Sequence, residues 1–271
     1  MNDSTIAFIG AGNMARSLAS GLVAAGTPAN RIRASDPDPD QRRLAAELGV
    51  TTFDDNDRCI ANAGTVVLAV KPQALGQVLK ALAIAPGQLV ISIAAGVPLA
   101  ALAGWTPAGT PLVRCMPNTP ALLGAGITGM FANAAATAAH RRAAEDVLGA
   151  AGRVLWVDAE GALDAVTAVS GSGPAYFFYL MEALIDAGES LGLDRASATA
   201  LTLETAYGAA RMAREGQDSP ARLRANVTSP GGTTERALSI LDAAGTRDTL
   251  QRAVAGAAQR ARELAEEFGR S

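Results

Sequence analysis

The sequence predicts an α/β domain with a mostly parallel sheet, followed by an all-helical domain. Three observations lead to this fold class. Short apolar runs alternate with helical patterns up to about residue 160, several runs are apolar throughout, and the pattern is purely helical after about Asp164. Alternating strands and helices imply parallel strands joined by right-handed crossovers. We therefore expect one domain over residues 1–163 and a second over residues 164–271.

The strands of the first domain are predicted from short apolar runs. These runs are Thr5–Ile9, Arg31–Ser35, Thr65–Val70, Leu89–Ala94 and Leu112–Met116, and Gly126–Ala132 and Arg153–Val157 are candidates to extend the sheet. Helical patterns lie between them at Met14–Ala25, Pro39–Leu48, Arg58–Ala61 and Leu75–Ala83. Strands such as Thr65–Val70 are expected where helices cover both faces of a sheet.

The second domain contains only helical patterns. Gly173-Pro174 opens a helix with an apolar stripe that runs from Phe177 to Leu191, and a second stripe runs from Leu250 to Phe268. Further helices are predicted at Arg195–Glu215, Ala221–Ala225 and Thr234–Ala243. The two stripes offer more apolar surface than one small bundle covers, so we expect at least a homodimer formed through this domain.

Composition excludes several classes of function. The formal net charge is −3 without a basic block, which argues against nucleic acid or an anionic membrane as a partner. The two cysteines, Cys59 and Cys115, cannot form a disulfide framework, and no targeting segment is visible, so we expect a cytoplasmic protein. His140 is the single histidine and lies at an expected exposed helix start, which nearly excludes Ser-His-Asp hydrolysis and histidine-rich zinc sites; we expect no metal.

A glycine motif follows the first predicted strand and opens the first helix. It comprises Gly10, Gly12, Asn13, Met14 and Ala15. Gly10 permits a tight turn, Gly12 lets a pyrophosphate approach the backbone, and the small third residue permits close packing. The helix N-terminus adds free N–H groups and the positive end of its dipole. The motif, in this context, predicts a Rossmann-type dinucleotide site.

Asp36, at the end of the second predicted strand, bears on which coenzyme is used. A carboxylate there can accept hydrogen bonds from the adenosine ribose hydroxyls, which favours NAD, and it would repel a 2′-phosphate. The alternative is that Asp36 belongs to a turn before the next helix, and Arg42 and Arg43 lie close enough to soften the repulsion. The sequence favours NAD without excluding NADP.

Other loops carry polar or glycine-rich sequence where a plain turn would be sufficient. Three follow predicted strands, at Val70–Gln73, Ala94–Val97 and Met116–Pro120, and we expect them to line one crevice at the carboxyl ends of the strands. Each alone is consistent with an ordinary turn. In the helical domain, Thr228–Thr234 places two glycines and two threonines at a helix N-terminus, which suits a small carboxylate, although a flexible surface loop remains the alternative.

These motifs together resemble pyrroline-5-carboxylate reductases over essentially the whole chain. The resemblance is carried by Gly10–Ala15, Ala69–Pro72, Met116–Pro120, Ser170–Tyr176 and Ser229–Thr234 in this order. It implies reduction of 1-pyrroline-5-carboxylate to L-proline with NAD(P)H, the last step of proline biosynthesis. It also implies dimers that assemble further, into decamers.

The resemblance implies roles for individual residues. The coenzyme would contact Gly10, Gly12, Asn13, Met14, Asp36, Asn56, Ala69, Val70, Lys71, Pro72, Ala95, Gly96, Asn118 and Asn226. The substrate would contact Glu160, Ser229, Gly232, Thr233 and Thr234. Imine reduction also requires a hydrogen-bonding group at the imine nitrogen, and Thr234 is the candidate catalytic residue for that role. NADP-using relatives often carry serine at the position of Asp36, and this difference affects the expected coenzyme preference but not the expected reaction.

Two other functions remain as alternatives. A β-hydroxyacid dehydrogenase or another imine reductase shares this layout, but β-hydroxyacid dehydrogenases use a lysine in the second domain and the last lysine here is Lys80. A nucleotide-sensing module without turnover is the other alternative. Reduction of a protonated imine needs no histidine base, because the coenzyme supplies the hydride, which agrees with the near absence of histidine.

Overall fold

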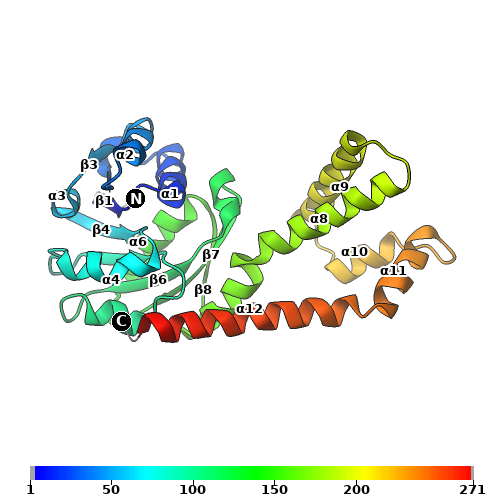
Figure 1. The fold of residues 1–271 in the computed structure, drawn as a ribbon. Coiled ribbons are helices and arrows are strands. Elements are labelled where there is room, and N and C mark those ends of the chain that lie inside the picture. Colours follow the sequence, from blue (N-terminus) through cyan, green and yellow to red (C-terminus); the bar gives the residue numbers. More distant parts are fainter. Residues whose placement is uncertain (1–3, 270–271) are drawn as a thin grey trace. The chain divides into compact units, whose positions relative to one another are not determined.

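The computed structural model describes residues 4–269, which divide into two compact units (Figure 1). The sheet unit comprises the residues up to Ser172 together with those from Ala257 onward, and the helical unit comprises Gly173–Gly256. The predicted fold class is confirmed, because a mostly parallel sheet precedes a run of helices. The predicted functional division between residues 163 and 164 stays a prediction.

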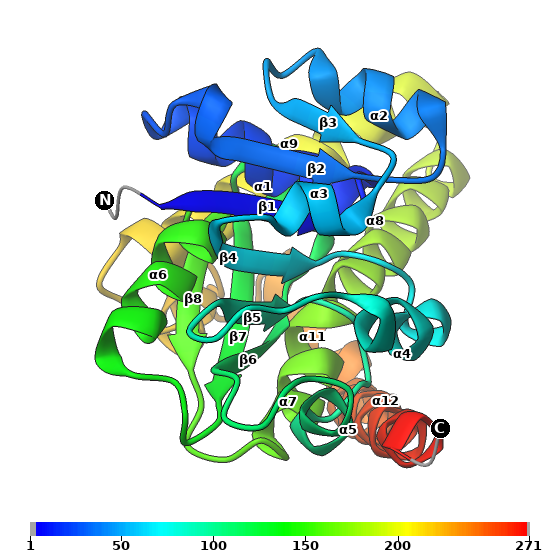
Figure 2. The same ribbon diagram turned by 90° about the vertical axis from the view of Figure 1, so that its left-hand side faces the viewer.

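The sheet unit is built on eight strands in the order β3-β2-β1-β4-β5-β6-β7-β8, visible in Figure 2. The strands are β1 Thr5–Ile9, β2 Ile32–Ser35, β3 Thr51–Phe53, β4 Ala63–Leu68, β5 Leu89–Ser92, β6 Leu112–Met116, β7 Gly126–Ala132 and β8 Gly152–Trp156. Neighbouring strands are parallel except β6 and β7, which are antiparallel. Strand β3 was not predicted, because a run of three residues is too short to show a hydrophobic period.

Helices cover both faces of this sheet. They are α1 Asn13–Ala24, α2 Pro39–Ala46, α3 Asn56–Ile60, α4 Pro72–Ala81, α5 Leu99–Gly104, α6 Ala138–Gly149 and α7 Ala162–Val166, with short helical turns η1 Ala29–Arg31, η2 Thr119–Leu123 and η3 Thr167–Gly171. One apolar core lies between the sheet and α1 with α6, and a second lies between the sheet and α3, α4 and α5. Burial on both faces explains why the central strands are almost wholly apolar.

The cysteines and the histidine have structural roles in the sheet unit. Cys59 and Cys115 are buried free thiols, and burial raises the pKa of Cys59 to about 11, so the reactive thiolate is disfavoured. His140 lies in the first turn of α6, where its Nδ1 accepts the N–H of Thr137 and its own N–H donates to the Thr137 hydroxyl. This reciprocal pair is a capping arrangement at the helix start where the histidine was predicted.

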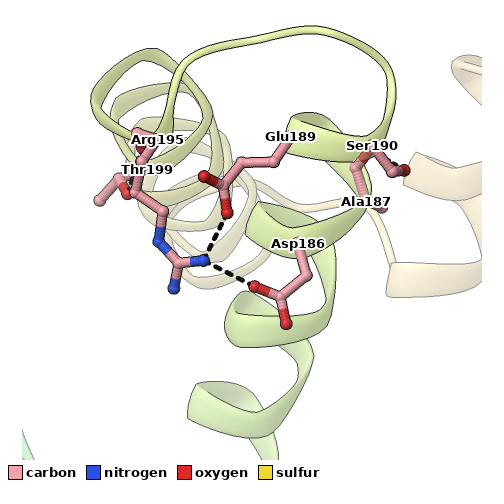
Figure 3. Close-up of polar contacts among 6 residues, drawn as sticks. All are labelled: Asp186, Ala187, Glu189, Ser190, Arg195 and Thr199. Carbon is pink, nitrogen blue, oxygen red and sulfur yellow. Dashed lines mark hydrogen bonds and ion pairs between the residues drawn. The ribbon is translucent and has the colours of Figure 1, made fainter.

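The helical unit contains α8 Gly173–Ser190, α9 Arg195–Glu215, α10 Pro220–Asn226, α11 Thr233–Ala243 and the first part of α12 Thr246–Gly269. Asp194 caps α9 by accepting the N–H of Ser197. Arg195 ties α9 to α8, because its Nη1 lies 2.7 Å from Asp186 Oδ1 and 2.6 Å from Glu189 Oε2 (Figure 3). The bounds of α9 are those predicted from the sequence.

Large apolar side chains on α8 lie at the surface of the structure. The exposed ones are Phe177, Phe178, Tyr179, Leu180 and Leu184. Within the described residues, no helix has the length and hydropathy needed to span a membrane. The same part of the chain holds no group of His, Cys, Asp and Glu side chains arranged for a metal ion.

Candidate active site

The loop after β1 passes directly beside the end of β4. Gly10 has a φ of +96°, and a Cβ atom there would lie 2.7 Å from the carbonyl oxygen of Ala69. Both the left-handed conformation and the close approach require glycine. The Cβ position of Gly12, by contrast, has nothing within 4 Å, so a ligand can reach its backbone.

Helix α1 begins at this loop with its first N–H groups uncapped. Gly12 is the N-cap residue, and no side chain caps the helix. The first turn of a helix has N–H groups without intrahelical partners, at the positive end of the dipole. With the open space at Gly12, this arrangement fits a pyrophosphate. Asn13 and Met14, predicted to contact the coenzyme, form the start of this turn.

The Asp36 carboxylate holds the glycine loop as well as its own turn. Its Oδ2 accepts the N–H of Ala11 at 2.9 Å, and its Oδ1 accepts the N–H of Asp38 at 3.0 Å. Asp38 in turn caps α2 by accepting the N–H of Asp40. Asp36 is therefore beside the glycine loop, as the dinucleotide pattern predicts, and also a turn residue, as the alternative proposed.

Arg16, which the sequence analysis did not single out, braces the same loop. Its guanidinium donates to the carbonyl oxygen of Ala11 at 2.6 Å, to Asn13 Oδ1 at 2.6 Å and to Gln41 Oε1 at 2.5 Å. These bonds join the glycine loop to the start of α2. The position of an arginine shortly after the glycine motif was the only indication of this role in the sequence. Its contact with Gln41 depends on where α2 lies in the fold, which the sequence does not show.

Asn56 and the residues after β4 lie along the same edge of the sheet. Asn56, the first residue of α3, accepts a hydrogen bond from the Ser35 hydroxyl at the end of β2. Lys71 is exposed at the N-cap position of α4, and Pro72 is the first residue of that helix. The structure thus places the predicted coenzyme residues of β1, β2 and β4 at the carboxyl ends of adjacent strands.

The loop after β5 is covered by the end of α12. Gly96 has a φ of +78°, and a Cβ atom there would lie 3.2 Å from Leu264 and 3.3 Å from Phe268. Ala95 and Gly96, predicted to contact the coenzyme, therefore lie in a loop held by packing from the last helix. Such a contact between residues so far apart in sequence left no signal in the sequence itself.

Asn118 connects three segments through its side chain. Its Oδ1 accepts the N–H of Ile127 in β7 at 2.9 Å, and its Nδ2 donates to the carbonyl oxygen of Ser170 at 3.2 Å. The side-chain amide thus orders the connection between β6 and β7. Its predicted contact with the coenzyme stays a prediction.

Glu160, the predicted substrate residue of the sheet unit, lies just before α7. Its Oε1 accepts a hydrogen bond from Arg114 Nη1 at 2.8 Å and another from the N–H of Leu99 at 2.7 Å. The Arg114 side chain is 7% exposed and the Glu160 side chain 28%. Arg114 was not predicted as a site residue, although a charged residue inside an otherwise apolar strand indicates a buried charge with a partner.

In the helical unit, the loop before α11 is ordered by its own backbone. The N–H of Gly232 donates to the carbonyl oxygen of Ser229 at 3.0 Å, and the N–H of Gly231 donates to Glu235 Oε2 at 2.7 Å. Gly232 is the N-cap residue of α11, so no side chain caps this helix. Thr233 and Thr234 are its first two residues, and Thr234 is half-buried.

Asn226 and Thr234 both lie at the ends of short helices in the helical unit. Asn226 is the last residue of α10, and its Nδ2 lies 3.4 Å from Asp218 Oδ2. Thr234 does not fill the N-cap position of α11, so the alternative that it merely caps this helix loses its structural basis.

Known protein families match segments of both the sheet unit and the helical unit. The family model described as pyrroline-5-carboxylate reductase dimerisation matches residues 160–264, and the model described as NADP oxidoreductase, coenzyme F420-dependent, matches residues 5–96. The pyrroline-5-carboxylate reductase of Pseudomonas aeruginosa is 53% identical over 99% of this chain and 100% of that protein.

Solved structures give the same result. A pyrroline-5-carboxylate reductase from Coxiella burnetii has a TM-score of 0.93 and 43% identity, covering 97% of this chain and 99% of that one. The pyrroline carboxylate reductase of Plasmodium falciparum, solved with NADP bound, has a TM-score of 0.86 and 28% identity over 98% and 99% of the two chains. From the full-length identity and the matched motifs, the chain belongs to the pyrroline-5-carboxylate reductase family.

Proposed function

We propose that the described site residues carry out the family reaction in this chain. The reaction is the reduction of 1-pyrroline-5-carboxylate to L-proline, the last step of proline biosynthesis. The observation that supports the site most strongly is the glycine loop, where an uncapped helix N-terminus and open space at Gly12 suit a dinucleotide pyrophosphate.

The experiment that tests the function follows NADH and NADPH absorbance with purified protein and 1-pyrroline-5-carboxylate. We expect coenzyme oxidation that requires substrate and is matched mole for mole by proline. Oxidation without proline, or none at all, would contradict the function.

The coenzyme residues suit NAD(P)H. Gly10, Gly12, Asn13 and Met14 would hold the pyrophosphate, and Asp36 and Asn56 would lie toward the adenosine ribose. Ala69, Val70, Lys71 and Pro72, Ala95 and Gly96, Asn118, and Asn226 would complete the coenzyme contacts. NAD(P)H, when bound, supplies the hydride that the imine carbon accepts. The sequence match to an NADP-type domain and the NADP-bound Plasmodium falciparum relative support this class of coenzyme.

The substrate is a cyclic imine with one carboxylate. The backbone N–H groups of the Ser229–Thr234 loop, Gly232 and Thr233 among them, would hold the carboxylate. Thr234 would hydrogen-bond the imine nitrogen, and Glu160 would contact the same ring. These residues orient the substrate and restrict water, which is what the chain must provide when the coenzyme carries the redox chemistry.

Substitution of Thr234 tests its assignment as the residue at the imine nitrogen. Thr234→Ala removes one hydrogen bond to a group whose charge changes during the reaction, which is worth about 1.5–3 kcal/mol. We expect kcat/KM to fall roughly 10- to 100-fold, and Thr234→Ser to keep most of the activity. Normal kinetics in Thr234→Ala with a lowered melting temperature would show a structural role instead.

Coenzyme preference depends on the charge of Asp36. Asp36→Ser removes a like charge from the 2′-phosphate position, an interaction of about 1 kcal/mol for charges about 4 Å apart in water. We expect the ratio of kcat/KM for NADPH to that for NADH to rise roughly fivefold or more. Asp36 also holds Ala11, so the melting temperature should fall as well.

Asp40→Ser is the matched control, since it removes a nearby carboxylate from the first turn of α2, where the Asp40 side chain is 79% exposed. Its coenzyme ratio should stay near the wild-type value. An equal rise in both variants, or an unchanged ratio in Asp36→Ser, would restrict Asp36 to a role in the turn.

The chain forms a homo-oligomer through residues that match the dimerisation family model. We infer that the basic unit is a dimer built on the exposed apolar side chains of α8, with the decamer implied by the family resemblance as the larger assembly. The cytoplasmic location expected from the sequence stays a prediction.

Light scattering on two matched variants tests the dimer. Leu184 on α8 is 51% exposed and Leu155 on β8, outside the dimerisation match, is 52% exposed. We expect the wild-type protein to have at least twice the chain mass at micromolar concentration, Leu184→Glu to lower that mass, and Leu155→Glu to keep it. A monomeric wild-type protein would contradict the assembly.

A further inference from the structure

A partly buried ion pair between Arg114 and Glu160, the predicted substrate residue, connects three segments. Oε1 of Glu160 accepts hydrogen bonds from Arg114 Nη1 at 2.8 Å and from the N–H of Leu99 at 2.7 Å. Arg114 belongs to β6, Leu99 is the first residue of α5, and Glu160 lies between β8 and α7. One carboxylate oxygen thus fixes the positions of a strand, a helix start and a loop.

Stability alone explains this arginine poorly. The Arg114 side chain is only 7% exposed. It lies on the same face of the sheet as the buried Leu112, and Arg114 is paired with Phe131 of the neighbouring strand β7. Burial of a guanidinium costs desolvation free energy that its partner only partly offsets, and apolar residues in place of buried ion pairs are often equally or more stabilising. A role in positioning the Glu160 carboxylate explains why a charged residue occupies this buried position.

The geometry leaves the second carboxylate oxygen available. Both hydrogen bonds converge on Oε1, and within residues 4–269 no hydrogen bond to Oε2 of Glu160 is present. The side chain is 28% exposed, so one end of the carboxylate reaches the surface while the other is fixed. A carboxylate held by two donors on one oxygen presents the other in a defined direction.

We propose that Arg114 is a positioning residue for the reductase reaction, which holds Glu160 so that its second oxygen meets the cyclic imine substrate. This inference rests on the proposed role of Glu160 in substrate binding. Arg114 itself contacts no substrate in this account, and its contribution passes through Glu160. Leu99 supplies the second donor through its backbone, so side-chain substitutions leave that bond in place.

The test compares Arg114→Met, Arg114→Lys and Glu160→Gln with the double variant Arg114→Met/Glu160→Gln. Arg114→Met keeps an unbranched side chain but removes the donors, and we expect KM for 1-pyrroline-5-carboxylate to rise about 10-fold or more. The dissociation constant of NADPH should stay within about twofold, because the pair acts on the substrate. Arg114→Lys keeps a cation and should recover part of the loss.

Two comparisons separate positioning from a general structural role. In the Glu160→Gln background, Arg114→Met should raise KM by less than about twofold further. The effects of the two substitutions are not additive if Arg114 acts only through Glu160. Arg33→Met is the matched control, since Arg33 is likewise an arginine within a strand, β2. Its guanidinium donates to the backbone carbonyl oxygens of Cys59 and Ala61 and not to a carboxylate. Arg33→Met should leave KM for the substrate unchanged. Melting temperatures of all variants report folding.

The outcomes distinguish the two proposals. If Glu160→Gln has a wild-type KM, the substrate role of Glu160 is wrong and this inference falls with it. If Glu160→Gln raises KM but neither Arg114→Met nor Arg114→Lys does, among the variants that fold, only the positioning role of Arg114 is overturned. The same follows if the losses add in the double variant. An effect confined to the NADPH dissociation constant would overturn it as well.

Discussion

The close approach of two backbones at the carboxyl edge of the sheet is the constraint on which the candidate site depends. At Gly10 a Cβ atom would lie 2.7 Å from the Ala69 carbonyl oxygen, so the end of β1 and the end of β4 touch without intervening side chains. This contact lets the chain turn directly into α1 and leaves the helix N-terminus open at Gly12. The ends of β2 and β5 lie at the same edge, and the loops that follow them hold Asp36 and the pair Ala95 and Gly96.

Charged side chains at this edge of the sheet act mainly through hydrogen bonds to backbone N–H and C=O groups. Asp36 accepts N–H groups from the glycine loop and its own turn, and Arg16 donates to the carbonyl oxygen of Ala11. Glu160 does the same for α5, with Arg114 as its counter-ion. Charge-assisted hydrogen bonds of this kind are stronger than neutral ones and fix loops that apolar packing reaches poorly. A residue at such a site can therefore have a structural and a ligand-binding role together.

The sequence predicted most of the fold because its strongest signals are local. Buried strands such as β4 show as apolar runs, and glycine before a helix start shows as a motif, so β1, α1 and the order of the elements were accessible. β3 escaped because three residues show no period. The partners of Arg114, and the packing of Phe268 over Gly96, depend on segments distant in sequence, and a single chain carries no local signal for them. The loop that contains Thr234 was predicted from its glycines and threonines before a helix, whereas Asn226 was identified only through family resemblance, because helix propensity carries no information on ligands.

The measurement that tests the central constraint most directly is the NADPH dissociation constant of Gly10→Ala against Gly26→Ala. Both glycines have positive φ, +96° and +94°, so each substitution adds conformational strain of about 1–2 kcal/mol. A Cβ atom at Gly26 meets nothing within 4 Å, whereas at Gly10 it collides with Ala69. We expect both variants to lose thermal stability, and only Gly10→Ala to bind NADPH about 10-fold or more weakly. Equal dissociation constants in the two variants would contradict the account.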